Sequence, residues 1–267
     1  MNNKNTLVLF GALFLSACGG GGDNASSRQY VPPGSAVLLF EDDFETGNLS
    51  KTVNGFRWTD RANTGVSNAA ARSGSYSLEF TYTTQPDGDA MSEQRFYLGG
   101  NYRDVSVEYD ILIPSNYYHR TQSGPANNKG FLYLWANTYA DPRPLVATNF
   151  WPDNSGQSIG SVYTRPNDLG HYMEFTAPAI STSDVGNWMH IVVRYAYASP
   201  SNNDGIAQIW KTPGGGSTVQ ILNKTNGAWY HAQGTGFDNG YLLGWSNSGF
   251  DQVTRFYIDN VKVWGAR

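Results

Sequence analysis

The sequence predicts an all-β protein built as a two-sheet antiparallel sandwich, and three observations predict it. From Val37 onward, short segments of alternating apolar and polar residues are separated by Gly, Asn, Pro and Asp, which is the pattern of strands and turns. No segment repeats apolar residues every three or four positions, so no long helix is expected. The 30 glycines and the aromatic content of 14% fit a strand-rich, turn-rich chain.

We expect one domain, roughly residues 33–267, with about a dozen strands. No internal repeat is present, which argues against a propeller or a β-helix. The expected strands are residues 36–44, 75–83, 92–98, 104–113, 130–138, 145–151, 158–164, 171–176, 188–197, 205–211, 217–222, 240–246 and 254–264.

Alternation assigns each expected strand an inner and an outer face. In 104–113, five apolar side chains share one face, and Ser106, Glu108 and Asp110 share the other. In 130–138 the outward residues are mostly aromatic, namely Phe131, Tyr133, Trp135 and Asn137. Aromatic side chains on a solvent face need a cover, and a sugar ring can stack on them. The alternative is that a long loop of the same chain lies over this sheet.

Length and composition exclude several classes of protein. The 267 residues are 40% apolar and 15% charged, which is unlike an intrinsically disordered chain. The formal net charge of −4 gives no basic face for phosphates, so we expect no nucleic acid partner. The one run apolar enough to enter a bilayer lies at the extreme N-terminus, which excludes a multi-span membrane protein.

Residues 1–17 have the composition of an export signal, with a basic start, the apolar run 6–15 and small residues after it. The tetrapeptide Leu15-Ser16-Ala17-Cys18 resembles the signal of bacterial lipoproteins. The resemblance implies that Cys18 is acylated, that residues 18–32 form a flexible tether, and that the membrane is contacted through the lipid alone. No aspartate follows Cys18, so we expect the outer membrane. The alternative is an ordinary secretory signal with a chance cysteine.

Several segments resemble a known family. They are residues 40–47 (FEDDFETG), 73–78 (SGSYSL), 256–264 (FYIDNVKVW), 186–193 (GNWMHIVV) and 203–210 (NDGIAQIW). Together they resemble the concanavalin-like jelly-roll superfamily of carbohydrate-binding modules, laminin-G-like domains and jelly-roll polysaccharide lyases. The resemblance implies a jelly-roll sandwich, and it does not fix an activity because this fold hosts lectins, hydrolases and lyases.

One strand resembles the lyases of this superfamily in particular. Residues 92–96 (SEQRF) resemble the strand with which jelly-roll lyases present an arginine to the substrate, which implies that role for Arg95. The Gln-Ile-His strand of alginate lyases has no counterpart, since residues 132–135 (LYLW) occupy its place. The resemblance therefore implies neither alginate specificity nor a catalytic histidine.

A lyase for uronate chains removes the proton at C5 and expels the 4-linked oxygen. It must neutralise the sugar carboxylate, which suits arginine or asparagine, and it needs a base and an acid. We expect Arg95 to neutralise the carboxylate, unless it forms a surface salt bridge with Glu93 or Glu108. Asn149 is a candidate for a second carboxylate contact. The base and acid stay open among Lys129, Tyr133, Tyr163, His119 and His171.

Three more residues are candidates for substrate binding. Trp135 and Trp151 are expected to stack on sugar rings, and Tyr118 lies in a loop unusually rich in tyrosine, histidine and arginine. His190 follows Trp188 in a strongly apolar strand, where we expect a packed side chain. Carboxylates at Glu45 and Asp259 would meet if the first and last strands pair, which predicts a structural Ca²⁺. The alternative for these two acids is hydrogen bonding in turns.

The sequence thus predicts a monomeric surface lipoprotein that cleaves an acidic polysaccharide by β-elimination. Two other functions stay open, a carbohydrate-binding lipoprotein without catalysis and a laminin-G-like adhesion domain. Hydrolysis is the weaker enzymatic prediction, because Glu108-Tyr109-Asp110-Ile111-Leu112-Ile113 lacks the second glutamate of the hydrolase strand in this fold.

Overall fold

Strands form at every position where the alternation predicts one. The computed structural model describes residues 30, 32–85, 88–121, 127–137, 139, 145–165, 171–200, 202–229 and 236–267. All thirteen expected regions contain a strand, and no helix occurs among the described residues. Three short strands were not expected, namely β2 (Thr52–Val53), β3 (Phe56–Ala62) and β4 (Thr64–Ser67).

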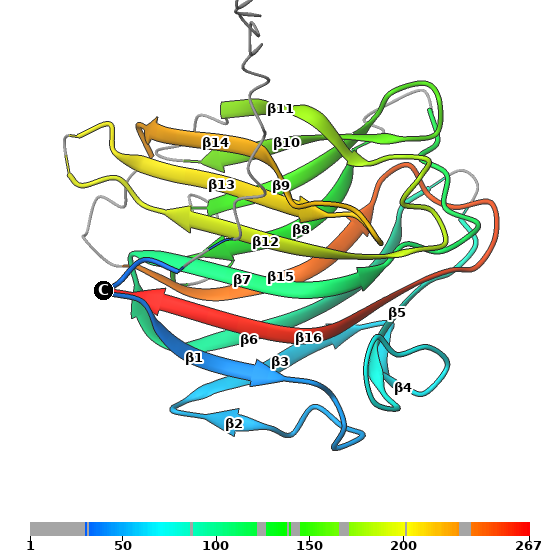
Figure 1. Cartoon of the computed structure of the whole chain (residues 1–267), viewed down its shortest axis with the longest axis horizontal. Coiled ribbons are helices and arrows are strands. Elements are labelled where there is room, and N and C mark those ends of the chain that lie inside the picture. Colours follow the sequence, from blue (N-terminus) through cyan, green and yellow to red (C-terminus); the bar gives the residue numbers. More distant parts are fainter. Residues whose placement is uncertain are drawn as a thin grey trace, which may run out of the picture.

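The strands form two antiparallel sheets that stack as a sandwich (Figure 1). In the first, sheet A, the order is β14-β13-β12-β7-β16-β5-β4, and β1 also pairs with β16. The remaining strands of sheet A are β1 (Val37–Asp42), β5 (Ser77–Tyr82), β7 (Asp104–Leu112), β12 (Trp188–Ala196), β13 (Gly205–Thr212), β14 (Val219–Gly227) and β16 (Thr254–Ala266).

The second sheet, sheet B, has the order β11-β10-β9-β8-β15-β6-β3-β2. Its strands besides β2 and β3 are β6 (Ala90–Tyr102), β8 (Asn128–Trp135), β9 (Leu145–Pro152), β10 (Ser158–Arg165), β11 (His171–Ile180) and β15 (Phe237–Ser246). Each sheet has one face in the core and one outer face, so the outer face of sheet B is turned away from sheet A.

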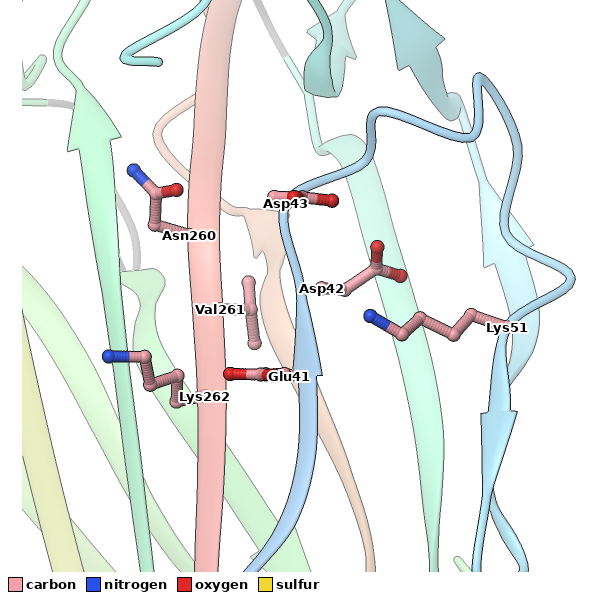
Figure 2. Close-up of a pocket in the computed structure, with 7 residues that line it drawn as sticks. All are labelled: Glu41, Asp42, Asp43, Lys51, Asn260, Val261 and Lys262. Atoms are coloured by element: carbon pink, nitrogen blue, oxygen red, sulfur yellow. The ribbon is translucent and has the colours of Figure 1, made fainter. Parts of the chain in front are cut away.

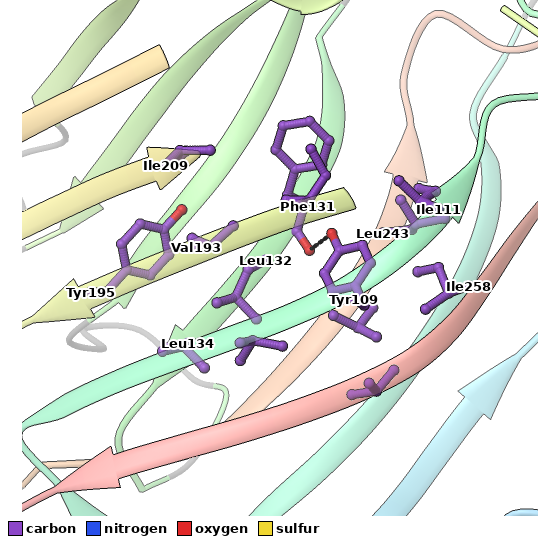
Figure 3. Packing of buried hydrophobic residues seen from close by; sticks show 14 of the residues in the cluster. Tyr109, Ile111, Phe131, Leu132, Leu134, Val193, Tyr195, Ile209, Leu243 and Ile258 are labelled. Atoms are coloured by element: carbon purple, nitrogen blue, oxygen red, sulfur yellow. Dashed lines mark hydrogen bonds between the residues drawn. The ribbon is translucent and has the colours of Figure 1, made fainter. Parts of the chain in front are cut away.

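The core fills the space between the two inner faces (Figure 3). The split expected for residues 104–113 is confirmed, because Val105, Val107, Tyr109, Ile111 and Ile113 are all buried there. Burial of side chains of this size stabilises the fold by roughly 1.5–3 kcal/mol each. The Tyr109 hydroxyl crosses the core and donates to the carbonyl oxygen of Phe131 over 2.8 Å, which ties sheet A to sheet B.

Two expected orientations were wrong. Phe131 points into the core, against Phe150 at a ring-centroid distance of 4.8 Å, although alternation predicts an outward side chain. His190 is on the outer face of sheet A, because the apolar partners that flank it, Met189 and Ile191, take the inner face. The outer face of this mostly apolar strand thus carries two polar side chains, His190 and Arg194.

The expected signal peptide, Cys18 and most of the tether lie outside the described residues, which begin at Tyr30. The Tyr30 ring lies 4.8 Å from the Trp210 ring, and its hydroxyl hydrogen-bonds with Ser106 on β7. Burial raises the pKa of Tyr30 to about 12. Tyr30 therefore packs on the outer face of sheet A. Among the described residues there is no helix of the length and hydropathy that a membrane span requires.

Candidate active site

The outer face of sheet B gathers most of the residues that the sequence singled out. Arg95 on β6 pairs with Tyr241 on β15, and Tyr241 pairs with Tyr133 on β8. Further along the sheet, Lys129 pairs with Asn149. We call this surface the aromatic face, and it comprises Arg95, Lys129, Tyr133, Trp135, Asn149, Trp151, Tyr163, Tyr241 and Trp245.

Strands β8 and β15 are irregular in the middle of the aromatic face. They pair at residues 239–241 and again at Ser246, with no pair between. Within that interval Leu243 has φ 55° and Gly244 has φ 123°. Leu243 consequently lies in the core, and so does Phe131 on β8. Irregularities of this kind re-aim side chains, and both residues leave a face on which alternation would place them.

The change of direction at Leu243 turns position 244 toward the aromatic face. A Cβ at Gly244 would lie 2.9 Å from Cε2 of Tyr241 and 3.2 Å from Cβ of Lys129. Only glycine combines this backbone with this contact, because a side chain at φ 123° is strained as well as crowded. Because Gly244 has no side chain, the space between Tyr241 and Lys129 stays open.

We expect Gly244→Ala to lower the kcat of the lyase activity that the sequence predicts by about a hundredfold, the effect of moving reacting groups by about 1 Å. The free energy of unfolding should fall by about 1–3 kcal/mol because of the strained φ. Thermal unfolding and steady-state kinetics measure the two effects. Gly65→Ala is the matched control, since no atom lies within 4 Å of a Cβ there. Equal kcat in both variants would contradict the prediction.

Arg95 is held by its neighbour on the same strand. Its Nε donates to Oε1 of Glu93 over 2.5 Å, and Glu93 is buried at 3% exposure. The Arg95 Cζ atom lies 5.0 Å from the Tyr139 ring centroid and 5.9 Å from that of Trp135. Burial alone would lower the pKa of Arg95, but the hydrogen bond and charge of Glu93 raise it. The guanidinium is thus a fixed cation against an aromatic wall.

Lys129 provides a second cation of a different kind. Its Nζ lies 6.0 Å from the Tyr133 ring centroid. Burial lowers the pKa of Lys129, and the more distant charge of Asp89 opposes that shift only in part. The lowered pKa makes the neutral amine, which is the form that accepts a proton, easier to reach than in an ordinary surface lysine.

Two tyrosines stack between these cations. The rings of Tyr133 and Tyr241 are 4.5 Å apart at an interplanar angle of 12°. The Tyr133 hydroxyl donates to Oδ1 of Asn149, so the asparagine amide group is oriented by the tyrosine. Burial raises the pKa of Tyr241 well above 10, which keeps its phenol protonated. Tyr133, Tyr241 and Trp135 are each at most 3% exposed, because Tyr139 and Tyr163 pack against them.

No protein-family model matches this sequence, and no curated protein matches it. Among solved structures, the endo-β-1,4-glucuronan lyase of the fungus Trichoderma reesei superposes with a TM-score of 0.58 at 19% identity, over 86% of this chain and 96% of its own. The PL-14 alginate lyase of Aplysia kurodai gives 0.60 at 9% identity, over 85% and 98%. A variant of the alginate lyase Aly36B bound to alginate trisaccharide gives 0.60 at 13%, over 87% and 99%. This chain has the concanavalin-like jelly-roll fold.

The jelly roll separates two predicted site residues from the aromatic face, and the side chain of a third is not among those described. His119 is fully buried, and its Nδ1 lies 2.8 Å from Oγ of Ser158, whose side chain shares the inner side of β10 with Val162. Tyr118 is exposed and packs on Gly156 in the β9–β10 turn. His171 begins β11, and its side chain lies outside the described residues.

The remaining predicted residues lie on the aromatic face of the jelly roll beside β10. Trp151 donates from Nε1 to Oγ of Ser161 over 2.9 Å, which orients the indole along the sheet. Tyr163 is partly buried against the Tyr133 cluster. The expected stacking role of Trp151 and acid–base role of Tyr163 stay predictions.

Sequence reasoning missed four residues of this site. Two of them, Tyr241 and Trp245, lie in the run 241–245 (YLLGW), where alternation fails and gives no outward signal. Glu93 was considered only as a partner that would compete for Arg95. Tyr139 lies beyond the end of β8, where no strand pattern applies. The adjacent Gly244 was the available signal, since glycine inside an apolar strand indicates a bulge or a close approach.

The acidic strand that suggested a hydrolase lies on the opposite side of the jelly roll. Glu108 and Asp110 are on the outer face of sheet A, where Nδ1 of His190 lies 3.2 Å from Oδ1 of Asp110 and Nε2 lies 3.8 Å from Oε2 of Glu108. Lys262 also approaches Glu108 at 3.6 Å. The two carboxylates therefore belong to an ion-pair network that the aromatic face does not share.

His190 is expected to make stability depend on pH. Burial alone would lower its pKa, but hydrogen bonds and charges from Asp110 and Glu108 raise it to about 9. A pKa raised in the folded state adds stability fully below the unfolded value of about 6.5, and this stability is lost as pH rises through 9. The melting temperature of the parent should exceed that of His190→Gln at pH 6, and the gap should close by pH 10. A difference in melting temperature that does not change with pH would contradict a stabilising role for these ion pairs.

Glu45 and Asp259 are occupied as hydrogen-bond acceptors. Oε1 of Glu45 accepts the backbone N–H groups of Ser75 and Tyr76 at 2.9 and 2.8 Å. Oδ2 of Asp259 accepts those of Arg72 and Ser73 at 2.8 and 3.0 Å. Oxygens facing two donor hydrogens are poor Ca²⁺ ligands, so these residues fit the alternative of hydrogen bonding in turns better. No group of three potential metal ligands occurs among the described residues. Structural calcium stays a prediction, which melting with and without chelator would test.

A surface hollow of about 240 Å³ lies away from the aromatic face, between β1 and β16 (Figure 2). Its lining carries both signs of charge, including Glu41, Lys51 and Lys262. Asp42 at its floor accepts from Nε1 of Trp58 over 2.8 Å and from the backbone N–H of Phe44 over 3.0 Å. Its buried carboxylate therefore fastens β1 to sheet B and is not offered to a ligand.

Proposed function

We propose that this protein is a polysaccharide lyase that cleaves a uronate-containing polysaccharide by β-elimination. One observation carries the proposal. A fixed guanidinium, a lysine of lowered pKa and two stacked tyrosines meet on one face of sheet B. The neighbours in fold that are named as lyases of glucuronan and alginate support the same reaction class.

Arg95 neutralises the carboxylate of the reacting sugar. Loss of the C5 proton places negative charge on that carboxylate, and a cation already fixed by Glu93 stabilises the charge without reorganising. The amide of Asn149, oriented by Tyr133, supplies a second contact to the same group. Removing one such electrostatic partner typically costs a factor of about 10²–10³ in kcat.

Lys129 accepts the C5 proton and Tyr241 supplies the proton for the leaving oxygen. The electron pair of the C5–H bond forms the C4=C5 double bond, and the C4–O bond breaks. Burial favours the neutral form of both side chains, which is the form each role requires. The departing alkoxide is a stronger base than a phenolate, so proton transfer from the phenol to it is favourable.

The test is incubation of the purified chain with alginate, glucuronan, ulvan and heparin-type polymers while absorbance of the unsaturated uronate is followed. We expect a rise on at least one of them and none on neutral glucans. Hydrolysis would give new reducing ends without this absorbance. Absence of the band on all four polymers, together with measurable binding, would contradict the lyase proposal.

A second function is carbohydrate binding without catalysis. The observation that favours it is the exposed indole of Trp245, since a sugar can stack on it without reaching the buried rings of Tyr133 and Tyr241. Binding with no absorbance change in the assay above is the result that this alternative predicts.

We also propose that acylated Cys18 holds the domain at the bacterial outer membrane. In support, residues 15–18 (LSAC) resemble the lipoprotein signal, and Tyr30 packs against the outer face of sheet A, opposite the aromatic face. Cell fractionation of the parent and of Cys18→Ser tests the anchor. The parent should sediment with outer membranes and the variant should be soluble, and equal distribution would contradict the anchor.

A further inference from the structure

The two ends of the aromatic face differ in their access to solvent. At one end Tyr133, Trp135 and Tyr241 are buried, while at the other Trp245 is 41% exposed. Trp245 points outward because its neighbour Ser246 turns inward and donates to Oδ1 of Asn128 over 2.9 Å. A large exposed indole has a cost in water unless a ligand covers it.

Trp245 lies next to the proposed base. On one side it pairs with Met91 of β6, and on the other side the following residue, Ser246, pairs with Asn128, which precedes Lys129. A ring stacked on Trp245 is therefore one step along the sheet from a ring that reacts between Lys129 and Tyr241. Trp245 therefore extends the candidate active site and does not form a separate site.

Polar groups lie next to this indole where β15 ends and β6 begins, since Ser246 pairs with Ala90. Nδ2 of Asn247 donates to Oδ1 of Asp89 over 3.0 Å, and Asp89 is exposed. Asp89 can accept hydrogen bonds from sugar hydroxyls, and its charge repels a sugar carboxylate. A pyranose ring can stack on the indole of Trp245 while its hydroxyl groups donate hydrogen bonds to the carboxylate of Asp89.

We propose that Trp245 is the platform of a sugar-binding subsite adjoining the reacting residue, with Asp89 and Asn247 as its hydroxyl contacts. This inference rests on the proposed function. It places the part of the polysaccharide next to the cleaved bond over Trp245. The buried aromatic end limits extension in the other direction. The substrate chain therefore extends over Trp245, and longer chains gain affinity there.

The experiment compares the full mature chain with Trp245→Ala and with Trp188→Ala, a control tryptophan on the outer face of sheet A. The probes are di-, tri-, tetra- and hexasaccharides of glucuronate and of alginate. Binding is measured by isothermal titration and turnover by the absorbance of the unsaturated product. We expect Trp245→Ala to raise Kd and KM for tetra- and hexasaccharides about tenfold, the change that about 1.4 kcal/mol of lost stacking produces. The kcat value and the Kd for disaccharide should stay unchanged.

The possible outcomes separate this inference from the lyase proposal. A Trp245→Ala variant that binds all lengths like the parent and like Trp188→Ala overturns the subsite. Weaker binding of long chains by Trp245→Ala alone supports the subsite, even if no chain is cleaved. An absence of cleavage would then overturn only the proposal that the protein is a lyase. An absence of binding to every oligosaccharide overturns both. Asp89→Ala should repeat the effect of Trp245→Ala in part, and a gain of affinity in Asp89→Ala would remove Asp89 from the subsite.

Discussion

Replacing Lys129 with methionine is expected to lower kcat by about 10²–10⁴-fold, the usual contribution of a positioned proton acceptor. Methionine keeps the length of the aliphatic stem that packs against Gly244 and removes only the amine. The KM value should change little, because carboxylate recognition is assigned to Arg95. Steady-state kinetics on the polymer that the parent cleaves measures both quantities.

The same variant should not lose stability. Burial lowers the pKa of Lys129, so at neutral pH the folded protein carries a cation that water would solvate better. For such a group, stability rises as pH increases through the folded pKa, and below that pKa the charge is a cost. Lys129→Met should therefore melt at or above the temperature of the parent at pH 7.

The pH profile distinguishes a base from a structural lysine. In the parent, kcat should rise with pH, and the apparent pKa of this rise should lie below the ordinary lysine pKa of about 10.4. Lys129→Met should lose this rise, whereas the control Lys224→Met on β14 should keep it. A residual activity in Lys129→Met that still follows the parental rise would assign the base to another residue.

Removing the Arg95 guanidinium is expected to reduce kcat/KM by about 10²–10³-fold. Arg95→Ala alone gives an ambiguous result, because it leaves the buried carboxylate of Glu93 without its cation. Breaking a buried pair in this way typically costs about 3–5 kcal/mol of stability. Loss of activity could then reflect unfolding, so the ion pair must be removed as a unit.

The informative variant is therefore Glu93→Gln combined with Arg95→Met, which removes both charges and keeps the volume. We expect this double variant to remain folded by thermal unfolding and circular dichroism while losing turnover. Arg95→Lys is the companion, since it keeps a charge near Glu93 but loses the planar fork that grips a carboxylate. Turnover within tenfold of the parent in the folded double variant would remove Arg95 from the neutralising role.

The sequence was sufficient for the architecture because alternation is a local property. Each of the thirteen expected regions holds a strand, and residues 104–113 divide between core and solvent as their pattern predicts. The missed strands β3 and β4 meet at Asn63, whose φ of 51° turns the chain abruptly. In β3 only Phe56 and Trp58 alternate before three polar residues follow, and β4 has one large apolar residue, Val66. Alternation over so few residues is too weak a local signal to predict a strand.

The site was less predictable because it depends on departures from alternation. Arg95, Tyr133 and Trp135 could be placed together, since they occupy regular parts of β6 and β8. Phe131 could not, because its inward turn accompanies the positive φ of Leu243 on the neighbouring strand, which no pattern in β8 encodes. His119 could not be excluded either, because its burial depends on Ser158, a partner 39 positions away.

The location of β16 has a consequence for how the protein is made. The last strand of the chain lies inside sheet A, with β7 along one edge and β1 and β5 along the other. A ribosome that has completed residues 1–253 has delivered fifteen of the sixteen described strands but not the one that joins the halves of this sheet. Pairings this distant in sequence form slowly. The nascent polypeptide therefore stays without a closed sandwich until β16 has been synthesised.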